Sequence, residues 1–150
     1  MTVLHLAATG KCSAELVKIL IEAGADVDAV NSFQMSPLHY ASKSSSVPVV
    51  KVLLEAGADV NAENSSQWSP LHYASWQNPA ILPVLLEAGA KVNVLTVVQH
   101  TPLYLAAKYK HEASVIALRA ASADPHLGKS PLTNSDVSDE MKALIKSLLK

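Results

Sequence analysis

A seven-residue phrase, Ser-Pro-Leu-His-Tyr-Ala-Ser, occurs twice in this chain, beginning at Ser36 and again at Ser69. Related phrases begin at Thr2 (Thr-Val-Leu-His-Leu-Ala) and at Thr101 (Thr-Pro-Leu-Tyr-Leu-Ala), so successive starts are separated by 34, 33 and 32 residues. Self-similarity at a period of this length is the signature of a stacked-repeat architecture. The chain is therefore expected to fold as an array of similar units.

A second phrase recurs in step with the first. The run Ala-Gly-Ala-Asp-Val begins at Ala23 and at Ala56, and Ala-Gly-Ala-Lys-Val begins at Ala88. Two separate phrases that keep a common offset resemble the ankyrin repeat, whose signature includes an opening Thr-Pro-Leu-His-x-Ala. The resemblance covers nearly the whole chain. It implies an all-α ankyrin-repeat solenoid, in which helix-turn-helix units are stacked and joined by hairpin-like loops.

The resemblance implies a single ankyrin-repeat domain, residues 1–150, with four units and a C-terminal cap. The units span approximately residues 1–32, 33–66, 67–98 and 99–129, and the cap spans residues 130–150. The hairpin-like loops are named here the first, second and third fingers, residues 25–35, 58–68 and 90–100. Since neither helix of a unit buries its apolar face alone, stability is expected to depend on stacking between neighbouring units.

Local signals predict the helices of each unit. A Thr or Ser caps the first helix, and a following proline such as Pro37 suits the first helical position, because its missing N–H needs no intrahelical partner there. An apolar stretch such as residues 16–21 has the length and spacing of a second, largely buried helix. Gly24, Gly57 and Gly89 follow these stretches and are expected to end the second helices in a left-handed conformation.

The histidines of the repeated phrase are expected to have a structural role. For His5, His39 and His72, the ankyrin resemblance implies hydrogen bonding between repeats rather than catalysis. Equivalent residues of adjacent units lie roughly 10 Å apart, the spacing of packed helices. That spacing is too long for one tetrahedral zinc, whose bonds to nitrogen are about 2 Å. We therefore expect no metal site and no catalytic histidine.

Composition restricts the classes of function. Hydrophobic residues make up 49% of the chain and charged residues 17%, which favours a folded core over disorder. The formal net charge of -1 provides no global case for nucleic-acid binding, and Lys142, Lys146 and Lys150 are expected to form a solvated helix face. A single cysteine, Cys12, excludes an intramolecular disulfide and fits the cytosol or nucleus. No secretion signal and no apolar stretch of about 20 residues is present, so membrane insertion is not expected.

Several positions depart from the ankyrin pattern. Gln34, Gln67 and Gln99 stand in the fingers where the family usually has glycine, so either the turn has changed type or each glutamine is strained. The loop between the two helices lacks its usual glycine in the second to fourth units, which have Ser45, Asn78 and Lys110 there. In the third unit Pro83 is incompatible with a helix interior, so the second helix is expected to begin at Pro83 after an irregular segment, residues 78–82.

The two ends of the array also differ from its middle. In the fourth unit Ser122 replaces the capping glycine and Arg119 replaces an apolar residue, and the next finger is contracted to residues 124–129. Apolar residues at helical spacing then predict a C-terminal helix whose apolar face packs on the array and forms the cap. These residues are Met141, Leu144, Ile145, Leu148 and Leu149. At the other end Thr2 begins the first phrase with no polar unit before it, so we expect a truncated array, an isoform, or a face covered by another chain. The chain is expected to be monomeric unless that bare face pairs.

Binding residues are expected on the fingers and on the first helices, where the family's recognition is generally attributed. Carrying those positions over, and choosing side chains that are large or aromatic, predicts a partner-binding set of Phe33, Met35, Trp68, Trp76, His100 and Tyr109. The same finger positions include Val30, Val97 and Val98. Trp and Tyr are enriched among interface hot spots, which favours a binding role. In the alternative interpretation these rings cover neighbouring loops or Trp76 folds inward, whereas Tyr40 and Tyr73 are expected in the core.

The predicted function is a protein-protein interaction module, a rigid scaffold that acts as an adaptor or inhibitor. The chain contains no glycine-rich phosphate loop, no zinc-ligand spacing and no nucleophile motif, so it is not expected to be an enzyme or to use a cofactor. The alternative is a non-catalytic regulatory fragment of a larger enzyme or of a ubiquitin-ligase adaptor. Nucleic acid ranks below protein as a partner, although exposed aromatics can stack on bases.

Overall fold

The computed structural model describes residues 1–10, 12–44 and 47–149, in which it contains helices and no strands. The helices are α1 (Val3–Ala7), α2 (Ala14–Glu22), α3 (Pro37–Ser44), α4 (Val47–Glu55), α5 (Pro70–Gln77), α6 (Leu82–Glu87), α7 (Pro102–Lys108), α8 (Glu112–Ala120) and α9 (Asp139–Ser147). The expectations for Ser45 and Lys150 fall outside the described residues. Among those residues no helix combines the length and the apolar character that crossing a membrane requires.

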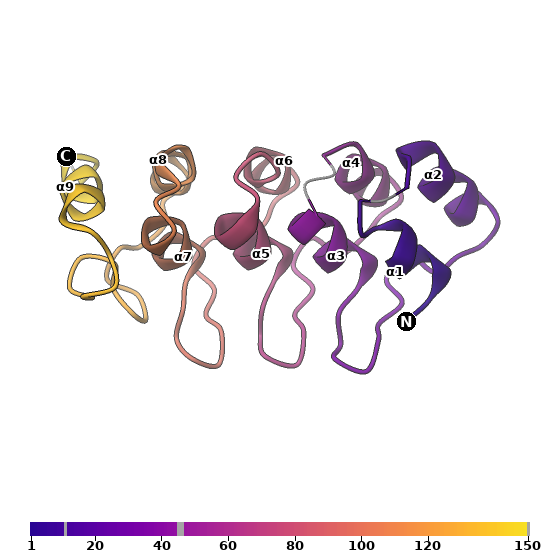
Figure 1. Ribbon diagram of the computed structural model, residues 1–150, viewed down its shortest axis with the longest axis horizontal. Helices are drawn as coiled ribbons and strands as arrows, with labels where there is room; N and C mark the ends of the chain where they lie inside the picture. Colours follow the sequence, from indigo (N-terminus) through magenta and orange to yellow (C-terminus); the bar gives the residue numbers. More distant parts are fainter. Residues whose placement is uncertain (11, 45–46, 150) are drawn as a thin grey trace.

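The helices form two rows, and the fingers project from one of them (Figure 1). The inner row, from which the fingers project, contains α1, α3, α5 and α7, and the outer row contains α2, α4, α6, α8 and α9. Within the rows α3 packs on α5, α5 on α7, and α2 on α4. The core is therefore continuous along the stack, and the predicted all-α repeat solenoid is confirmed.

The leucine of each repeated phrase forms the centre of this core. Leu4, Leu38, Leu71 and Leu103 occupy equivalent positions in the four inner helices, and each is almost completely buried. Burying one leucine side chain contributes about 2 kcal/mol, so the four together contribute about 8 kcal/mol to the stability of the stack. The period of the sequence is thus the period of the core.

The predicted helix ends are confirmed. The side-chain oxygen of Thr101 accepts a hydrogen bond from the backbone N–H of Tyr104 at 3.0 Å, and Pro102 begins α7. At the ends of the outer helices, Gly24, Gly57 and Gly89 have φ values of 91°, 88° and 86°. These values lie in the left-handed region, where glycine has no side chain to clash.

The glutamines of the fingers adopt the conformation that the family's glycine usually supplies. Gln34, Gln67 and Gln99 have φ values of 58°, 57° and 64°, so the turn is retained and the residue takes the left-handed conformation. This conformation costs a residue with a Cβ about 1 kcal/mol. Lys110 and Ser122 are also left-handed, with φ of 60° and 66°.

The third unit is irregular between its helices, as Pro83 predicts. Helix α6 begins at Leu82, one residue before the expected start, so Pro83 is the second helical residue. The N–H groups of the first helical turn have no intrahelical acceptor, so proline loses no hydrogen bond at this position. Asn78 ends α5 with φ -145°, and a turn leads from it to Ile81.

A ladder of histidines joins the units. The Nε2 atom of His5 bonds to the carbonyl oxygen of Met35 at 2.8 Å. His39 and His72 make the equivalent bonds to the carbonyl oxygens of Trp68 (3.0 Å) and His100 (3.1 Å). In each ring Nδ1 accepts the backbone N–H of the capping residue, at 3.0 to 3.1 Å. Nε2 therefore carries the proton, and the predicted inter-repeat role of these histidines is confirmed.

A second ladder runs through the fingers. The side-chain oxygens of Asp28, Asn61 and Asn93 each accept a backbone N–H from the next unit, at distances of 3.0, 2.8 and 2.7 Å. Each asparagine also donates its Nδ2 to a carbonyl oxygen of that unit, Gly89 or Ser122, at 3.3 and 3.2 Å. Asp28 has no side-chain donor with which to make this second bond.

The C-terminal helix α9 packs on α8 and closes the stack. Met141 and Ile145 are buried, and Leu144 and Leu148 are half-buried against the core. Leu149 is 46% exposed, so its prediction as part of the buried stripe is wrong. It follows the end of α9 and no longer continues the helical face.

Arg119 has a specific role at this end of the array. Its guanidinium donates hydrogen bonds to the carbonyl oxygens of Ala123 and Leu148, the latter at 3.2 Å. The side chain therefore bridges the end of α8 to the end of α9. This contact explains why an arginine occupies a position where an apolar residue is expected.

Candidate protein-binding surface

Three of the predicted binding residues occupy one position in three fingers. Met35, Trp68 and His100 are each the last finger residue, directly before the Ser or Thr that caps the next inner helix. Their carbonyl oxygens are the acceptors of the histidine ladder. All three side chains are half-buried. The backbone at this position is thus held by the fold, while the side chain differs from unit to unit.

Four aromatic rings form a continuous cluster beside this position. Trp68 lies 5.0 Å from Tyr73 and 5.5 Å from Trp76, measured between ring centroids. Trp76 lies 6.1 Å from Tyr109, which follows the last residue of α7. We name Trp68, Tyr73, Trp76 and Tyr109 the aromatic strip. It runs from the second finger across α5 to the C-terminal end of α7.

Exposure differs along the aromatic strip. Tyr109 is 43% exposed, Trp68 and Trp76 are half-buried, and Tyr73 is buried. The two tryptophans pack against the hydrophobic core on one side. Trp76 is therefore neither folded into the interior nor free in solvent. Rings held in this way are rigid, and a rigid contact surface loses little conformational entropy on binding.

The tyrosines of the repeated phrase connect the inner helices to the fingers. The hydroxyl of Tyr73 accepts a hydrogen bond from Asn64 Nδ2 at 3.0 Å and contacts Met35 Sδ at 3.9 Å. Tyr40 accepts the equivalent bond from Asn31 at 2.9 Å and is half-buried. Burial raises the pKa of Tyr73. Tyr73 lies in the core as predicted, but it also belongs to the aromatic strip, which its place in the repeated phrase does not indicate.

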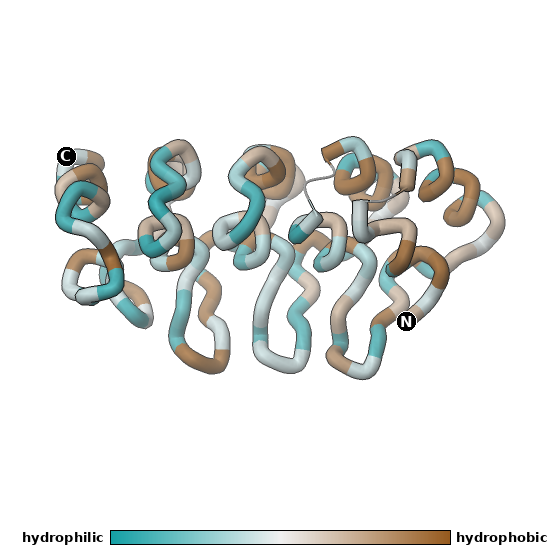
Figure 2. Tube along the Cα trace, viewed as in Figure 1, coloured by the Kyte–Doolittle hydropathy of each residue, from teal (hydrophilic) through white to brown (hydrophobic). Residues whose placement is uncertain are grey.

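The finger tips form a second apolar area, separate from the aromatic strip. Phe33 is 68% exposed, and Val30, Val97 and Val98 are also exposed. Figure 2 shows hydrophobic residues at the tip of the third finger, the loop below α7. Neighbouring fingers are tied by backbone bonds, Ser65 N to Phe33 O at 3.0 Å and Val97 N to Ser66 O at 3.2 Å. The tips of the three fingers are thus linked into one continuous edge.

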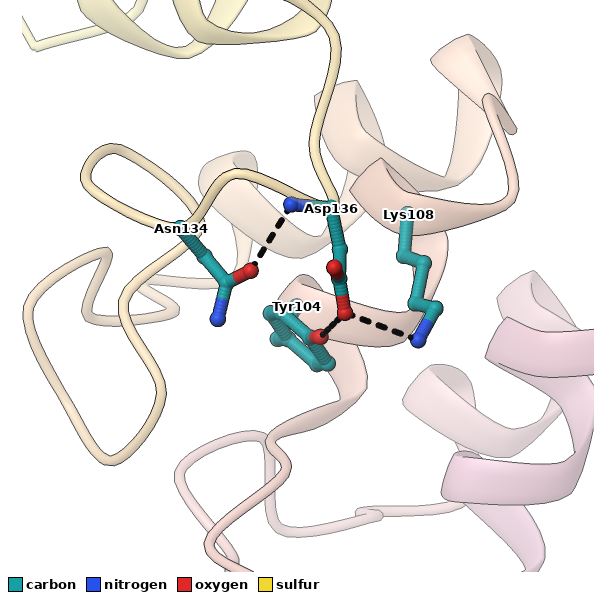
Figure 3. A network of polar contacts seen from close by, with 4 residues as sticks. All are labelled: Tyr104, Lys108, Asn134 and Asp136. Carbon is teal, nitrogen blue, oxygen red and sulfur yellow. Dashed lines mark hydrogen bonds and ion pairs between the residues drawn. The ribbon is translucent and has the colours of Figure 1, made fainter.

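A polar network borders the aromatic strip at its C-terminal end (Figure 3). Tyr104 takes the place of the ladder histidine in the fourth unit, and its hydroxyl donates to Asp136 Oδ2 at 3.1 Å. Lys108 Nζ donates to the same oxygen at 3.1 Å, and Asn134 accepts the Asp136 N–H at 2.9 Å. Hydrogen bonds from Lys108 and Tyr104 lower the pKa of Asp136. The network ties the cap to α7, beside the contracted finger.

His100 lies on top of this network. Its ring is stacked on that of Tyr104, with centroids 4.6 Å apart and planes inclined by 27°. Burial lowers the pKa of His100, and the charges of Lys129 and Lys108 lower it further. A neutral, half-buried imidazole is therefore favoured at this end of the surface.

Carboxylates are unevenly distributed between the two helical rows. The helices α1, α3, α5 and α7 contain no Asp or Glu. The outer helices carry acidic residues, among them Glu22, Glu55 and Glu87 at the last positions of α2, α4 and α6. The row that carries the aromatic strip is therefore free of helical carboxylates.

Two further findings concern the remaining surface. In the part of the chain that the structure describes, no three His, Cys, Asp or Glu side chains are grouped so that they could hold a metal ion. An open hollow of about 250 Å³ lies between α2 and α4, lined by Lys18, Ile21, Glu22, Val52, Glu55 and Ala56. It belongs to the outer row and contains none of the predicted binding residues.

These observations define a class of protein, a helical repeat solenoid that presents a varied surface on a regular frame. The chain belongs to the ankyrin-repeat family, because the family model described as ankyrin repeats (3 copies) matches residues 4–96. No curated protein matches the sequence. Ankyrin repeats are generally protein-protein interaction modules, and ankyrin-repeat proteins are typically non-catalytic.

Proposed function

We propose that the whole chain, residues 1–150, is one non-catalytic binding domain of four units and a cap, which recognises a protein partner through the inner row and the fingers. The observation that carries this proposal is the aromatic strip, which contains both tryptophans of the chain. Trp and Tyr dominate interface energetics because one rigid ring buries a large area. The partner-binding residues proposed are Phe33, Met35, Trp68, Trp76, His100 and Tyr109.

The role proposed is that of an adaptor or inhibitor, which acts by occupying a partner's surface. A monomer in the cytosol or nucleus is proposed as the working form. The presence of a single cysteine, the half-buried Cys12, supports a reducing compartment.

The proposal is tested with substitutions that the repeats themselves supply. Phe33 in the first finger corresponds to Ser66 in the second. Trp76 corresponds to Lys43 and Lys108, because each of these three residues lies seven positions after the Ser or Thr that begins its phrase. Phe33→Ser and Trp76→Lys therefore introduce residue types that the same fold position already accommodates elsewhere in this chain. Circular dichroism is expected to show unchanged helix content for the double variant.

Affinity capture from cell lysate, followed by mass spectrometry, is the measurement. The unmodified protein is expected to enrich a partner that the double variant loses by at least tenfold, since two hot-spot rings are removed. The control is Ile116→Ala, which removes an exposed apolar side chain from α8 in the outer row. Equal capture by the folded double variant, or equal loss with Ile116→Ala, would contradict the proposed surface.

A further inference from the structure

We infer that the segment recognised by the aromatic strip is an acidic peptide with an apolar centre, bound across α3, α5 and α7. This inference rests on the proposed function and specifies the chemistry of the partner. It arises from the charges that flank Trp76 on the inner row.

One position of the inner helices alternates between cation and aromatic ring. Lys43 on α3, Trp76 on α5 and Lys108 on α7 each lie seven residues after the Ser or Thr of their phrase. Trp76 is therefore flanked on both sides by a lysine of a neighbouring unit. Because α3, α5 and α7 contain no Asp or Glu, these helices offer no carboxylate of their own to either lysine.

Further positive charge lies beside His100, the last residue of the third finger. Lys129 is exposed, and after burial it is the next largest influence that lowers the pKa of His100, followed by Lys108, while the carboxylate of Asp136 opposes them. Carboxylates of the neighbouring segments include Asp59 and Glu63 in the second finger, Glu112 at the start of α8 and Asp136 in the cap. Asp136 is already bound by Lys108 and Tyr104. Lys108 is thus paired with Asp136, whereas Lys43 makes no ion pair among the described residues. The inner helices themselves add positive and no negative charge, which favours a negative segment over a positive one.

The spacing sets the length of the segment. Packed helices lie roughly 10 Å apart, so Lys43 and Lys108 are about 20 Å apart with Trp76 midway. An extended chain advances about 3.3 Å per residue and covers that distance with about six residues. Carboxylates near both ends, with an apolar side chain between them, match the order of lysine, ring and lysine. At the Lys108 end the peptide carboxylate joins or displaces Asp136, which binds Lys108 at 3.1 Å. The rings lie 5.0 to 6.1 Å apart between centroids, so they pack on one another and the apolar side chain lies against them rather than between them.

Three synthetic eight-residue peptides with the same Leu-Phe centre test the inference, flanked by Glu, by Gln or by Lys. The readout is tryptophan emission, because Trp68 and Trp76 are the chain's two tryptophans and both belong to the aromatic strip. The Glu-flanked peptide is expected to shift the emission and to bind at least tenfold more tightly than the Lys-flanked peptide. Its Kd is expected to rise with salt, since screening weakens attraction between exposed charges.

A charge-reversal pair locates the interaction. Lys43→Glu is expected to weaken binding of the Glu-flanked peptide about three- to tenfold, in keeping with a charge at the rim of an interface. The matched control is Lys51→Glu on α4, an exposed lysine of the outer row, which is expected to leave the Kd unchanged. Trp76→Lys is expected to weaken binding of all peptides that shift the emission.

The outcomes separate this inference from the proposed function. If the three peptides bound with equal affinity and Trp76→Lys weakened that binding, the preference for an acidic partner would be overturned. The proposed binding surface would still be supported. If calorimetry detected peptide binding that did not change the tryptophan emission and was not affected by Trp76→Lys, the peptide would bind elsewhere. That result would overturn both the acidic partner and the proposed binding surface. No binding by any peptide at millimolar concentration would overturn the acidic partner.

Discussion

The histidine of the repeated phrase is held neutral by the way its two ring nitrogens are used. In His72, Nδ1 accepts the N–H of Ser69 and Nε2 donates to the carbonyl of His100. A proton added to Nδ1 would face a donor, and burial already disfavours the charged ring. Burial lowers the pKa of His72 to about 4 and also lowers that of His39.

The consequence at the residue scale is a loss of stability in mild acid. As the pH falls below about 6.5, the unfolded chain binds a proton at residue 72 while the folded protein does not, so the folded state is disfavoured until the pH reaches about 4. Between pH 7.5 and 5.0, His72 is expected to account for a loss of about 2 kcal/mol in the free energy of unfolding, measured in urea.

Two variants check the origin of this pH dependence. His72→Gln is expected to be less stable at pH 7.5 but to lose less stability between pH 7.5 and 5.0. His126→Gln changes an exposed histidine of the contracted finger and is expected to keep the original pH dependence. An unchanged pH dependence in His72→Gln would contradict the assignment.

The left-handed glutamines are a second feature at the residue scale. Gln67 has φ 57°, and Gln67→Gly is expected to raise the free energy of unfolding by up to about 1 kcal/mol by relieving the clash of its Cβ. Gln77→Gly is the matched control, because Gln77 is an exposed residue of α5 where glycine is expected to cost up to about 1 kcal/mol. Urea unfolding of both variants measures the difference. Destabilisation by both would show that Gln67 is not strained.

At the element scale, the fingers are held by an asparagine ladder that has one aspartate in it. Asn61 and Asn93 each make two bonds to the next unit, whereas Asp28 makes one, to the N–H of Asp59. Asp28→Asn adds a donor for the carbonyl of Gly57, the equivalent of Gly89. The variant is expected to raise the free energy of unfolding by about 0.5 to 1 kcal/mol.

The reverse substitution provides the check. Asn61→Asp removes the donor that bonds to Gly89, and is expected to lower the free energy of unfolding by a similar amount. Both values come from urea titrations at pH 7.5. A destabilised Asp28→Asn protein would mean that the charged bond to Asp59 outweighs the added one.

At the scale of the whole molecule, the two ends of the stack differ. Apolar residues of α1 and α2 are exposed at the N-terminal end, including Val3 (65%), Leu6 (52%) and Leu16 (41%). Of the equivalent residues of the second unit, Pro37 and Val49 are buried and Tyr40 is half-buried. The N-terminal face therefore has the same chemistry as the faces that contact one another inside the stack.

An added unit is expected to cover this face. A fusion that carries a copy of residues 36–68 directly before Thr2 is expected to have a Tm several degrees higher, because the added apolar burial stabilises the fold. Leu6→Glu is expected to cancel most of this gain in the fusion. In the unfused protein the same exposed change is expected to alter the Tm little. Equal Tm values for the fusion and the original protein, measured by differential scanning calorimetry, would contradict the docking of the added unit.

The sequence alone predicts the repeat period and the helix ends, because these depend on local chemistry, and the ankyrin resemblance implies the inter-repeat role of the histidines. Thr101 caps α7 and Pro102 begins it, so two adjacent residues are enough to predict this helix start. Gly57 ends α4 because its φ of 88° suits glycine. Pro83 predicts the irregular third unit to within one residue. The family model, which matches residues 4–96, agrees with the same signals.

The tertiary structure alone decides which side chains share a surface. Trp76 and Tyr109 are 33 positions apart and meet because α5 packs on α7, and Tyr104 reaches Asp136 because the cap returns to α7. Tyr73 belongs both to the core and to the aromatic strip, which its place in the phrase does not reveal. Contacts between units depend on the distance and angle of stacking, and a repeat period contains neither quantity. The sequence thus determines the frame, and stacking determines the candidate binding surface.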